Sequence, residues 1–201
     1  AEPWVPERLP LFGINDGAYH QHADHPGLMT KREVRIQLLA ELDLPSSGVL
    51  WDLGAGTGSV GLEALRLKPE LQLYAVERRS GAVPLIEANA ERLAVQPAAV
   101  LQGDARMLLA ELPDPDRVLL GGGGVARAEL LATLLPRLRP GGVVVIPLAT
   151  LEAVAELRPV LEAHGLQVSL MQLQVSRGMP LAGGTRLAPL NPVVVLRGCR
   201  A

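Results

Sequence analysis

The stretch that decides the fold is Leu50-Trp51-Asp52-Leu53-Gly54-Ala55-Gly56-Thr57-Gly58. Its apolar start predicts a buried strand, and residues 59–64 (Ser-Val-Gly-Leu-Glu-Ala) predict the beginning of a helix. Glycine adopts left-handed backbone conformations without strain and has no Cβ to block a ligand. The first N–H groups of a helix also lack partners within the helix. We therefore expect residues 54–58, called the glycine turn below, to hold a nucleotide-like cofactor.

Glycine spacing separates two classes of cofactor. A dinucleotide turn follows the pattern G-x-G-x-x-G, which would place the third glycine at position 59. Position 59 is a serine, the third glycine is Gly58, and Asp52 stands two positions before Gly54. This pattern resembles the first motif of the seven-stranded S-adenosylmethionine methyltransferases. A glycine turn that serves only chain geometry is the structural alternative.

Two acidic residues follow the next two predicted strands. Glu77 comes 23 positions after Gly54, near the offset of about 20 at which an acid meets ribose hydroxyls in nucleotide-binding folds. A solvated carboxylate at a strand end is the alternative for Glu77. Asp104 and Ala105 stand where the same class of methyltransferase contacts the adenine ring, although Asp104 also fits a helix N-cap.

Short apolar runs alternate with amphipathic segments, which predicts parallel strands covered by helices. The fold class we expect is α/β, the Rossmann-like seven-stranded sheet of class I S-adenosylmethionine methyltransferases with antiparallel C-terminal strands. Strands are expected at 49–53, 72–77, 99–102, 117–120 and 143–147, and helices near 59–67, 81–94, 104–111 and 125–138. Residues 166–175 and 192–197 predict an antiparallel pair of strands, and Thr150 is expected to cap the last helix.

Size and charge exclude several classes of function. With 201 residues, 48% of them hydrophobic, the chain can bury one substantial core, and we expect a single domain over 1–201. A formal net charge of −2 argues against a general nucleic-acid binder, which carries a basic surplus. No apolar run approaches the roughly 20 residues that a membrane-spanning helix needs. Cys199 is the only cysteine, so a cytoplasmic location without disulfides is expected.

The first 30 residues carry a different pattern. Residues 1–28 predict an irregular segment, either a substrate-facing lid or a mobile polar stretch. Thr30 and Glu33 stand three apart before apolar residues, which predicts a capping box. Three histidines precede them: His20, His22 and His25. Histidine carries protons near neutral pH, so His20 is a candidate proton carrier. The spacing of the three histidines also suits zinc ligands, but we expect no metal because no cysteine accompanies the histidines.

Several segments together resemble one family more closely. They are Gly13-Ile14-Asn15-Asp16, residues 29–35, the glycine turn, Gly103-Asp104-Ala105, and residues 121–124, 174–178 and 190–193. From about Leu11 to Gly198 the chain resembles the decarboxylating precorrin-6Y C5,15-methyltransferase family of cobalamin biosynthesis. That family has its activity in one long polypeptide or in two proteins, and this chain resembles the smaller, C-terminal part. A start at Ala1, without methionine, is consistent with a processed protein or with excision from a fusion.

The resemblance implies an activity, a cofactor and partners. It implies methylation of C15 of precorrin-6B, a tetrapyrrole, with decarboxylation of its C12 acetate and S-adenosylmethionine as cofactor. Methylation of C5 then belongs to an N-terminal domain or a separate subunit. A homo-oligomer is implied, with a tetramer as one candidate, and neither nucleic acid nor a membrane is expected as partner. The cofactor contacts carried over are Thr30, Gly54, Ala55, Gly56, Thr57, Gly58, Glu77 and Ala105, with Asp104 as a further candidate.

A tetrapyrrole substrate calls for cations in its pocket, because it carries many acetate and propionate groups. The candidates are Lys31, Arg35, Arg106, Arg127, Arg177 and Arg186. A solvated surface role is the alternative for each of them. Arg177 is preferred, because it precedes residues 178–184, a segment expected to be flexible and to border the active site. Residues 121–124, four glycines, are expected to leave room for a flat macrocycle.

Three other functions stay open. A methyltransferase acting on RNA, protein or another small molecule fits the glycine turn, although Leu120-Gly121-Gly122 differs from the Asn/Asp-Pro-Pro-Tyr pattern of amino-group methylases. A nicotinamide-dependent oxidoreductase is disfavoured by Ser59. A non-catalytic subunit that keeps the fold is the third.

Overall fold

The computed structural model of the chain describes residues 5–22, 29–121 and 124–201. The strands are β1 (Ser47–Leu53), β2 (Glu70–Glu77), β3 (Ala99–Gln102), β4 (Arg117–Leu120), β5 (Val143–Leu148), β6 (Gln167–Leu173), β7 (Ser176–Leu181), β8 (Gly184–Pro189) and β9 (Val193–Cys199). The α-helices are α1 (Arg32–Glu41), α2 (Ser59–Leu67), α3 (Ala82–Leu93), α4 (Ala105–Leu108), α5 (Arg127–Leu134) and α6 (Leu151–Ala163). Short 3-10 helices are η1 (Pro6–Arg8), η2 (Asp16–Ala18), η3 (Leu109–Glu111), η4 (Gly124–Ala126) and η5 (Leu135–Arg137).

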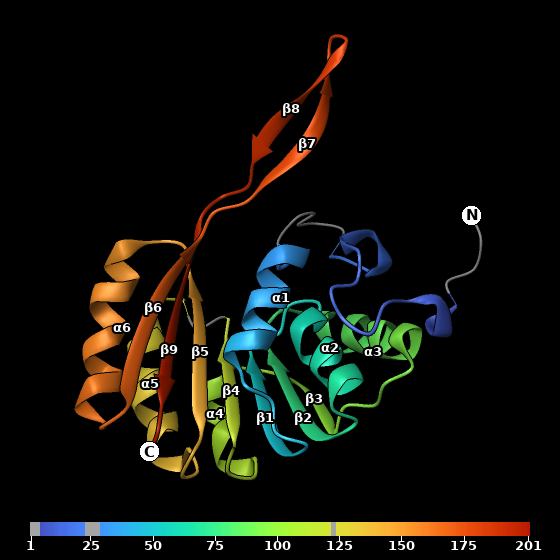
Figure 1. Cartoon of the computed structure of the whole chain (residues 1–201). Coiled ribbons are helices and arrows are strands. Elements are labelled where there is room, and N and C mark those ends of the chain that lie inside the picture. The colour runs from blue at the N-terminus through green and yellow to red at the C-terminus, as the bar shows by residue number, and fades with distance from the viewer. Residues whose placement is uncertain (1–4, 23–28, 122–123) are drawn as a thin grey trace.

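Seven of the strands within these residues form one sheet, in the order β3-β2-β1-β4-β5-β9-β6 (Figure 1). The pairs among β1 to β5 are parallel, whereas β9 runs antiparallel to both β5 and β6. This is the class I S-adenosylmethionine methyltransferase fold that the sequence predicts, and the expected antiparallel pair at its C-terminal end is confirmed. No helix in the described parts of the chain is long and apolar enough to cross a membrane.

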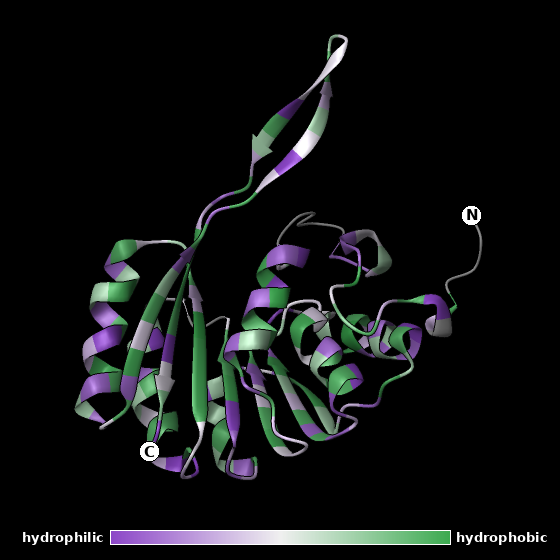
Figure 2. Cartoon of the chain, in the orientation of Figure 1, coloured by the Kyte–Doolittle hydropathy of each residue, from purple (hydrophilic) through white to green (hydrophobic). Residues whose placement is uncertain are grey.

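The central strands β1, β4 and β5 are buried on both faces, because consecutive strand residues point into two different hydrophobic clusters. In β5, Val143 and Val145 belong to the first cluster, and Val144 and Ile146 belong to the second. Residues of α1, α2 and α3 complete the first cluster, and residues of α5 and α6 complete the second (Figure 1). A parallel strand buried on both faces is apolar throughout, as the hydropathy of β5 shows (Figure 2).

The bounds of several predicted elements match the structure, and two predicted helices are shorter than expected. The strands at 99–102 and 117–120 and the helix at 59–67 have the predicted bounds. The segment 104–111 divides into α4 and η3, and α5 covers only the middle of the segment 125–138. Pro136 lies within η5 directly after α5. Proline lacks a backbone N–H and clashes with the preceding helical turn, so it ends α5.

The largest departure from the sequence prediction is the segment 178–184, which we expected to be flexible. It belongs to an antiparallel hairpin, residues 176–189, in which β7 and β8 are paired throughout. This hairpin, called the arm below, projects from the body beyond the ends of β6 and β9 (Figure 1). Gly178 and Pro180 are unfavourable strand residues, which is why the sequence pattern gave no strand signal here.

The start of α1 also differs from the prediction. Lys31 is the N-cap residue, and no side chain caps the helix, so the predicted capping box is wrong. Glu33, which we expected to reach back to the backbone, instead accepts hydrogen bonds from Arg177 of the arm. Thr150 does cap α6, because its hydroxyl accepts a hydrogen bond from the Ala153 N–H at 3.3 Å. Thr30 therefore has no capping role in α1.

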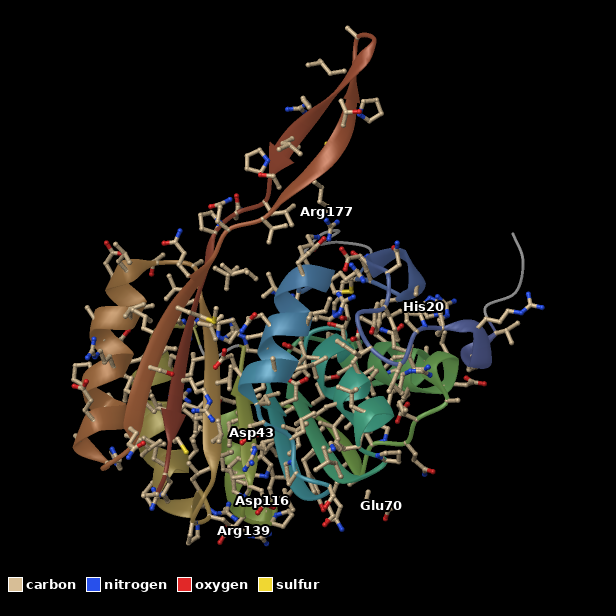
Figure 3. All side chains as sticks on the ribbon, viewed as in Figure 1. His20, Asp43, Glu70, Asp116, Arg139 and Arg177 are labelled. Atoms are coloured by element: carbon tan, nitrogen blue, oxygen red, sulfur yellow. The ribbon has the colours of Figure 1, made fainter. Side chains whose placement is uncertain are left out.

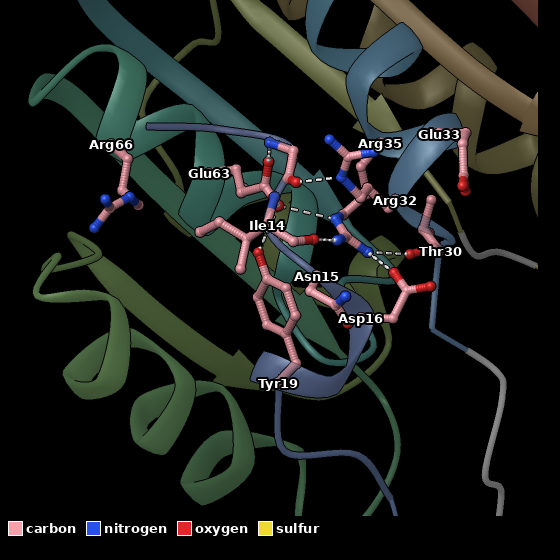
Figure 4. A network of polar contacts seen from close by, with 12 residues as sticks. Ile14, Asn15, Asp16, Tyr19, Thr30, Arg32, Glu33, Arg35, Glu63 and Arg66 are labelled. Carbon is pink, nitrogen blue, oxygen red and sulfur yellow. Dashed lines mark hydrogen bonds and ion pairs between the residues drawn. The ribbon is translucent and has the colours of Figure 1, made fainter. Parts of the chain in front are cut away.

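A fully buried arginine joins the N-terminal segment to α1 and α2 (Figure 4). The Nε atom of Arg35 in α1 lies 2.9 Å from Oε1 of Glu63 in α2, and its Nη1 lies 2.8 Å from Oδ1 of Asp16. Its remaining N–H groups donate to the backbone carbonyls of Ile14 and Thr30. The guanidinium also lies 4.9 Å from the centre of the Tyr19 ring.

Glu63 completes this network from the other side. Its carboxylate accepts hydrogen bonds from the backbone N–H of Gly13 at 2.6 Å and from the Tyr19 hydroxyl at 2.7 Å. Burial, reinforced by the Glu63 charge, raises the pKa of Tyr19, so this hydroxyl stays a donor. Ile14 is fully buried as well. Residues 13–19 are therefore part of the packed body, and the mobile polar alternative does not apply to them.

Asp52 connects the end of β1 to α2. It is 2% exposed, and its Oδ2 accepts a hydrogen bond from the Gly61 N–H at 3.3 Å. A Cβ at Gly61 would lie 2.9 Å from this oxygen and 2.8 Å from Leu73, so only glycine allows the helix to approach. Burial raises the pKa of Asp52 to about 7, and the charge of Glu77 adds to the rise. This contact holds α2 against the strand that leads into the glycine turn.

Replacing the buried arginine tests the network. Arg35→Met should lower the free energy of unfolding by about 3–5 kcal/mol, because it leaves Glu63 buried without a cation. Urea denaturation measures the loss. The control is Arg158→Met, which removes an exposed ion pair with Glu162 within α6 and should cost less than about 1 kcal/mol. Equal costs for the two variants would show that the network does not hold the segments together.

The raised pKa of Asp52 predicts a pH-dependent stability. Between the unfolded pKa near 3.9 and the folded value of about 7, the folded chain binds more protons than the unfolded chain. The stabilisation from protonated Asp52 is therefore complete below the unfolded pKa and is lost as pH rises to the folded pKa. Relative to the native chain, Asp52→Asn should gain about 2 kcal/mol between pH 5 and pH 8, measured by urea denaturation. The exposed control Asp104→Asn should show no such gain.

Candidate functional site

The candidate site lies where parallel strands end at one edge of the sheet. Leu53, the last residue of β1, pairs with Leu120 at the end of β4, and Glu77 pairs with Gln102 at the ends of β2 and β3. The glycine turn follows β1 directly. In open α/β sheets, ligands bind beyond the carboxyl ends of the strands. The glycine turn and Glu77 therefore lie at the edge where such a ligand is expected.

The glycine turn has a left-handed backbone at each of its glycines. The φ angles are 79° at Gly54, 59° at Gly56 and 76° at Gly58. L side chains rarely adopt this conformation, so the three glycines are needed for the turn itself. The first two N–H groups of the turn donate to the backbone carbonyl of Val76 in β2, at 2.8 and 3.1 Å. The spacing G-x-G-x-G thus follows from the shape of the backbone.

The turn leaves space for a ligand on one side only. A Cβ at Gly56 would meet no heavy atom within 4 Å, whereas a Cβ at Gly58 would lie 2.9 Å from Ile86 of α3. The hydroxyl of Thr57 is buried and has no hydrogen-bond partner among the described residues. An unpaired buried hydroxyl costs about 1–3 kcal/mol, which a polar ligand would recover. Open space at Gly56 and an unpaired Thr57 fit the nucleotide-like cofactor expected here.

Glu77 braces the turn from the neighbouring strand. Its Oε2 accepts a hydrogen bond from the Gly56 N–H at 2.9 Å, and its Oε1 accepts one from the Arg79 N–H at 3.1 Å. The residue is 8% exposed. Each carboxylate oxygen can accept a second hydrogen bond, so Glu77 can hold the turn and still meet ligand hydroxyls. The spacing from Gly54 identified this residue, but not its contact with the turn.

Asp104 is the N-cap of α4, as one of the two interpretations predicted. Its side chain accepts a hydrogen bond from the Arg106 N–H at 3.0 Å and lies 2.7 Å from the Arg106 guanidinium. These hydrogen bonds lower the pKa of Asp104 to about 2. Ala105 is the first residue of α4 and is half-buried. Contact of Asp104 or Ala105 with a cofactor stays a prediction.

The end of β4 approaches the glycine turn closely. The Gly121 N–H donates to the backbone carbonyl of Leu53 at 2.9 Å, and a Cβ at Gly121 would lie 3.3 Å from the carbonyl oxygen of Gly54. A side chain at position 121 would therefore crowd the backbone of the turn. Gly122 and Gly123 lie outside the described residues, so the room expected for a macrocycle over 121–124 stays a prediction.

The N-terminal histidines are placed only in part. The His20 side chain is exposed on the N-terminal segment (Figure 3). Its backbone is held by the side chain of Asn89. His22 is half-buried, and His25 lies outside the described residues. The described parts of the chain contain no group of three His, Cys, Asp or Glu residues that could hold a metal ion. The role of His20 as a proton carrier stays a prediction.

Asn89 is a site residue that the sequence did not indicate. It is fully buried in α3, and its amide donates to the carbonyl oxygens of His20 at 3.1 Å and Thr57 at 3.0 Å. Its Oδ1 also accepts a hydrogen bond from the His20 N–H at 2.7 Å. Asn89 thus joins the N-terminal segment to the glycine turn. No local pattern could have identified it, because its partners lie 32 and 69 positions away.

The candidate substrate cations differ in what they contact. Arg35 is fully buried in the network described above, so the prediction that it holds substrate is wrong. Arg106 pairs with Asp104 and with Glu129 at 3.1 Å. Arg127 begins α5, and Arg186 lies exposed on β8. Lys31 lines a cavity of about 400 Å³ between the start of α1 and the base of the arm.

Arg177, the preferred candidate, is engaged by carboxylates of the chain itself. It lies at the base of the arm above α1 (Figure 3). Its Nε and Nη2 contact the two carboxylate oxygens of Glu33 at 2.9 and 2.6 Å, and Nη2 also lies 2.9 Å from Oδ2 of Asp16. The hydrogen bond from Arg177 lowers the pKa of Glu33. A direct grip of Arg177 on substrate therefore stays a prediction.

Known proteins resemble the chain over most of its length. Residues 21–200 match the family described as "Precorrin methyltransferase domain". The chain is 37% identical over 170 residues to "Probable cobalt-precorrin-6B C(15)-methyltransferase (decarboxylating)" of Pyrobaculum aerophilum, covering 84% of this chain and 87% of the relative. It is 34% identical to "Precorrin-6Y C(5,15)-methyltransferase [decarboxylating]" of Sinorhizobium sp, covering 92% of this chain but 43% of that longer relative.

A solved structure matches the fold closely as well. The precorrin-6Y C5,15-methyltransferase from Geobacter metallireducens has a TM-score of 0.89 at 30% identity, covering 96% of this chain and all of the other. The C-terminal domain of precorrin-6Y C5,15-methyltransferase from Rhodobacter capsulatus has a TM-score of 0.81 at 28% identity, with the same coverage. By its sequence, its glycine turn and its seven-stranded sheet, the chain belongs to the precorrin methyltransferase domain family.

Proposed function

We propose that this chain methylates C15 of precorrin-6B and removes the carboxylate of the C12 acetate as carbon dioxide, in cobalamin biosynthesis. The observation that carries the proposal is the glycine turn braced by Glu77, in a chain that matches decarboxylating precorrin methyltransferases over most of its length. The relatives include enzymes named for cobalt-precorrin and for precorrin, so the substrate is a tetrapyrrole with or without cobalt.

S-adenosylmethionine is the proposed cofactor, and it supplies a methyl group activated on a positively charged sulfur. The backbone of the glycine turn and the hydroxyl of Thr57 would hold its polar groups, and Glu77 would accept hydrogen bonds from its ribose. The open space at Gly56 and the unpaired Thr57 hydroxyl support this assignment. Thr30, Asp104 and Ala105 complete the proposed contact set. Thr30 also lines the cavity beside α1.

The contribution of the protein to both steps is positioning. Methyl transfer needs C15 aligned with the donor, and a large part of such a barrier is removed by holding the two reactants in place. Decarboxylation breaks the bond between the carboxylate carbon and its methylene, the electron pair enters the conjugated macrocycle, and a proton then completes a methyl group at C12. His20 is the proposed proton carrier, supported by its exposed side chain on the N-terminal segment.

We also propose that the chain assembles with copies of itself, with a tetramer as one form. The arm exposes Met179, Leu181 and Leu187, which are 46%, 57% and 73% exposed. By register, Met179 and Leu187 lie on opposite faces of the arm. An isolated two-stranded hairpin is at best marginally stable in water, so contact with a second copy would stabilise it.

The remaining partner is the activity that methylates C5. We assign it to a separate domain or subunit, and the longer Sinorhizobium relative, whose name includes both positions, supports the assignment. A cytoplasmic location is part of the proposal, and the single cysteine, Cys199, supports it.

Two glycine substitutions test the cofactor site. Gly56→Ala should lower the affinity for S-adenosylmethionine at least tenfold, because its Cβ would occupy the open side of the turn. The control is Gly141→Ala, since Gly141 has a similar φ of 71° and also no atom within 4 Å of its Cβ position. Titration calorimetry measures both affinities, and thermal unfolding measures the strain that the two variants share. An equal loss of affinity in both variants would contradict the assignment.

Mass spectrometry tests the reaction. Precorrin-6B, with or without cobalt, is incubated with the chain and S-adenosylmethionine. The expected product gains one methyl group and loses carbon dioxide, and Glu77→Ala should reduce the yield at least tenfold. A chain that binds S-adenosylmethionine but leaves both forms of the tetrapyrrole unchanged would contradict the proposal. Transfer of labelled methyl to RNA would favour the alternative methyltransferase function.

A further inference from the structure

The cavity beside α1 has two walls from distant parts of the sequence. One wall is the start of α1, with Thr30, Lys31 and Val34. The other is the base of the arm, with residues such as Leu173 and Leu190. The start of α1 and the base of the arm therefore both bound the cavity.

The lining of the cavity is mostly apolar, and the charge among its described residues is positive. Lys31 is its cation, Thr30 and Asn191 are its other polar side chains, and no acidic side chain belongs to its lining within the described residues. The cavity measures about 400 Å³. This volume is near the lower end of the range of about 300–1,000 Å³ for pockets that enclose a drug-sized ligand. A tetrapyrrole is larger than such a ligand, so the cavity suits one edge of the macrocycle. An apolar, carboxylate-bearing group matches both its walls and its charge.

Arg177 joins the two walls. Its guanidinium, on the arm, binds both carboxylate oxygens of Glu33, which lies on α1 between Lys31 and Val34 of the cavity wall. The contact to Asp16 adds a second anchor, and Asp16 is held in turn by the buried Arg35. Side-by-side hydrogen bonds of this kind fix orientation as well as distance. We call the contacts among Arg177, Glu33 and Asp16 the clasp.

We propose that this cavity binds a carboxylate-bearing edge of the tetrapyrrole, with Lys31 as the cation, and that Arg177 is a positioning residue that closes the cavity through the clasp. The inference rests on the proposed function for the identity of the substrate. It departs from the sequence prediction for Arg177, because the guanidinium edge that would grip a substrate carboxylate already binds Glu33.

Lys31→Met tests the cation. Binding of precorrin-6B, measured by equilibrium dialysis, should weaken about tenfold, while the affinity for S-adenosylmethionine in calorimetry should stay within twofold of the native value. The matched control is Lys68→Met, because Lys68 is the other lysine of the chain and ends α2 away from the cavity. Unchanged dialysis binding in Lys31→Met would overturn the assignment of the cavity. Normal dialysis binding by the native chain without methyl transfer would instead overturn the proposed function alone.

A charge exchange tests the clasp. Arg177→Glu should raise the KM for precorrin-6B at least tenfold, because Glu33 then repels the arm. The double variant Arg177→Glu/Glu33→Arg recreates the ion pair in reverse and should recover most of the loss. If Arg177 bound substrate directly, the double variant would remain as impaired as the single one, and the positioning role would be overturned. Arg158→Glu, in the exposed pair of α6, is the control for a charge change that touches neither wall.

Discussion

A buried charge needs a partner, and the pairing of Arg35 with Glu63 decides how three segments of this chain pack. Both side chains are fully buried, so neither can rely on water. Each therefore collects protein hydrogen bonds, and the donors and acceptors come from the N-terminal segment. Removing one member of such a pair is far more costly than exchanging both for apolar residues. The network consequently holds α1, α2 and residues 13–19 together. Gly58, the last residue of the glycine turn, is the N-cap of α2, so the network also supports the turn.

The glycine turn was predictable because its backbone demands leave a mark in the sequence. Gly54, Gly56 and Gly58 each take a conformation that other residues avoid, and their spacing alone separated this turn from a dinucleotide turn. The strands of the sheet were predictable for a similar reason. The central strands β1, β4 and β5 are buried on both faces, so each is largely an apolar run. Local constraints of this kind can be inferred from a single sequence.

Contacts between distant segments were not predictable. Arg35 and Glu63 are 28 positions apart, and Arg177 and Glu33 are 144 positions apart. Glu33 illustrates how a contact with a distant residue can replace a predicted local contact. The local pattern predicted a capping box, but a charge-assisted, paired hydrogen bond to Arg177 is stronger than a hydrogen bond to a backbone N–H. The arm was missed as well, since it has no buried face to impose an apolar pattern on its strands.

The place of β9 in the sheet has a consequence for how the chain folds. β9 lies between β5 and β6, although it follows β6 in the sequence with the whole arm between them. During synthesis, β1 to β5 can pair as they emerge, but β6 has no neighbour in the sheet until residues 193–199 have been made. Non-local pairing of this kind is slow compared with local contacts. The half of the sheet that carries the arm is therefore expected to assemble last, onto a glycine turn that is already formed.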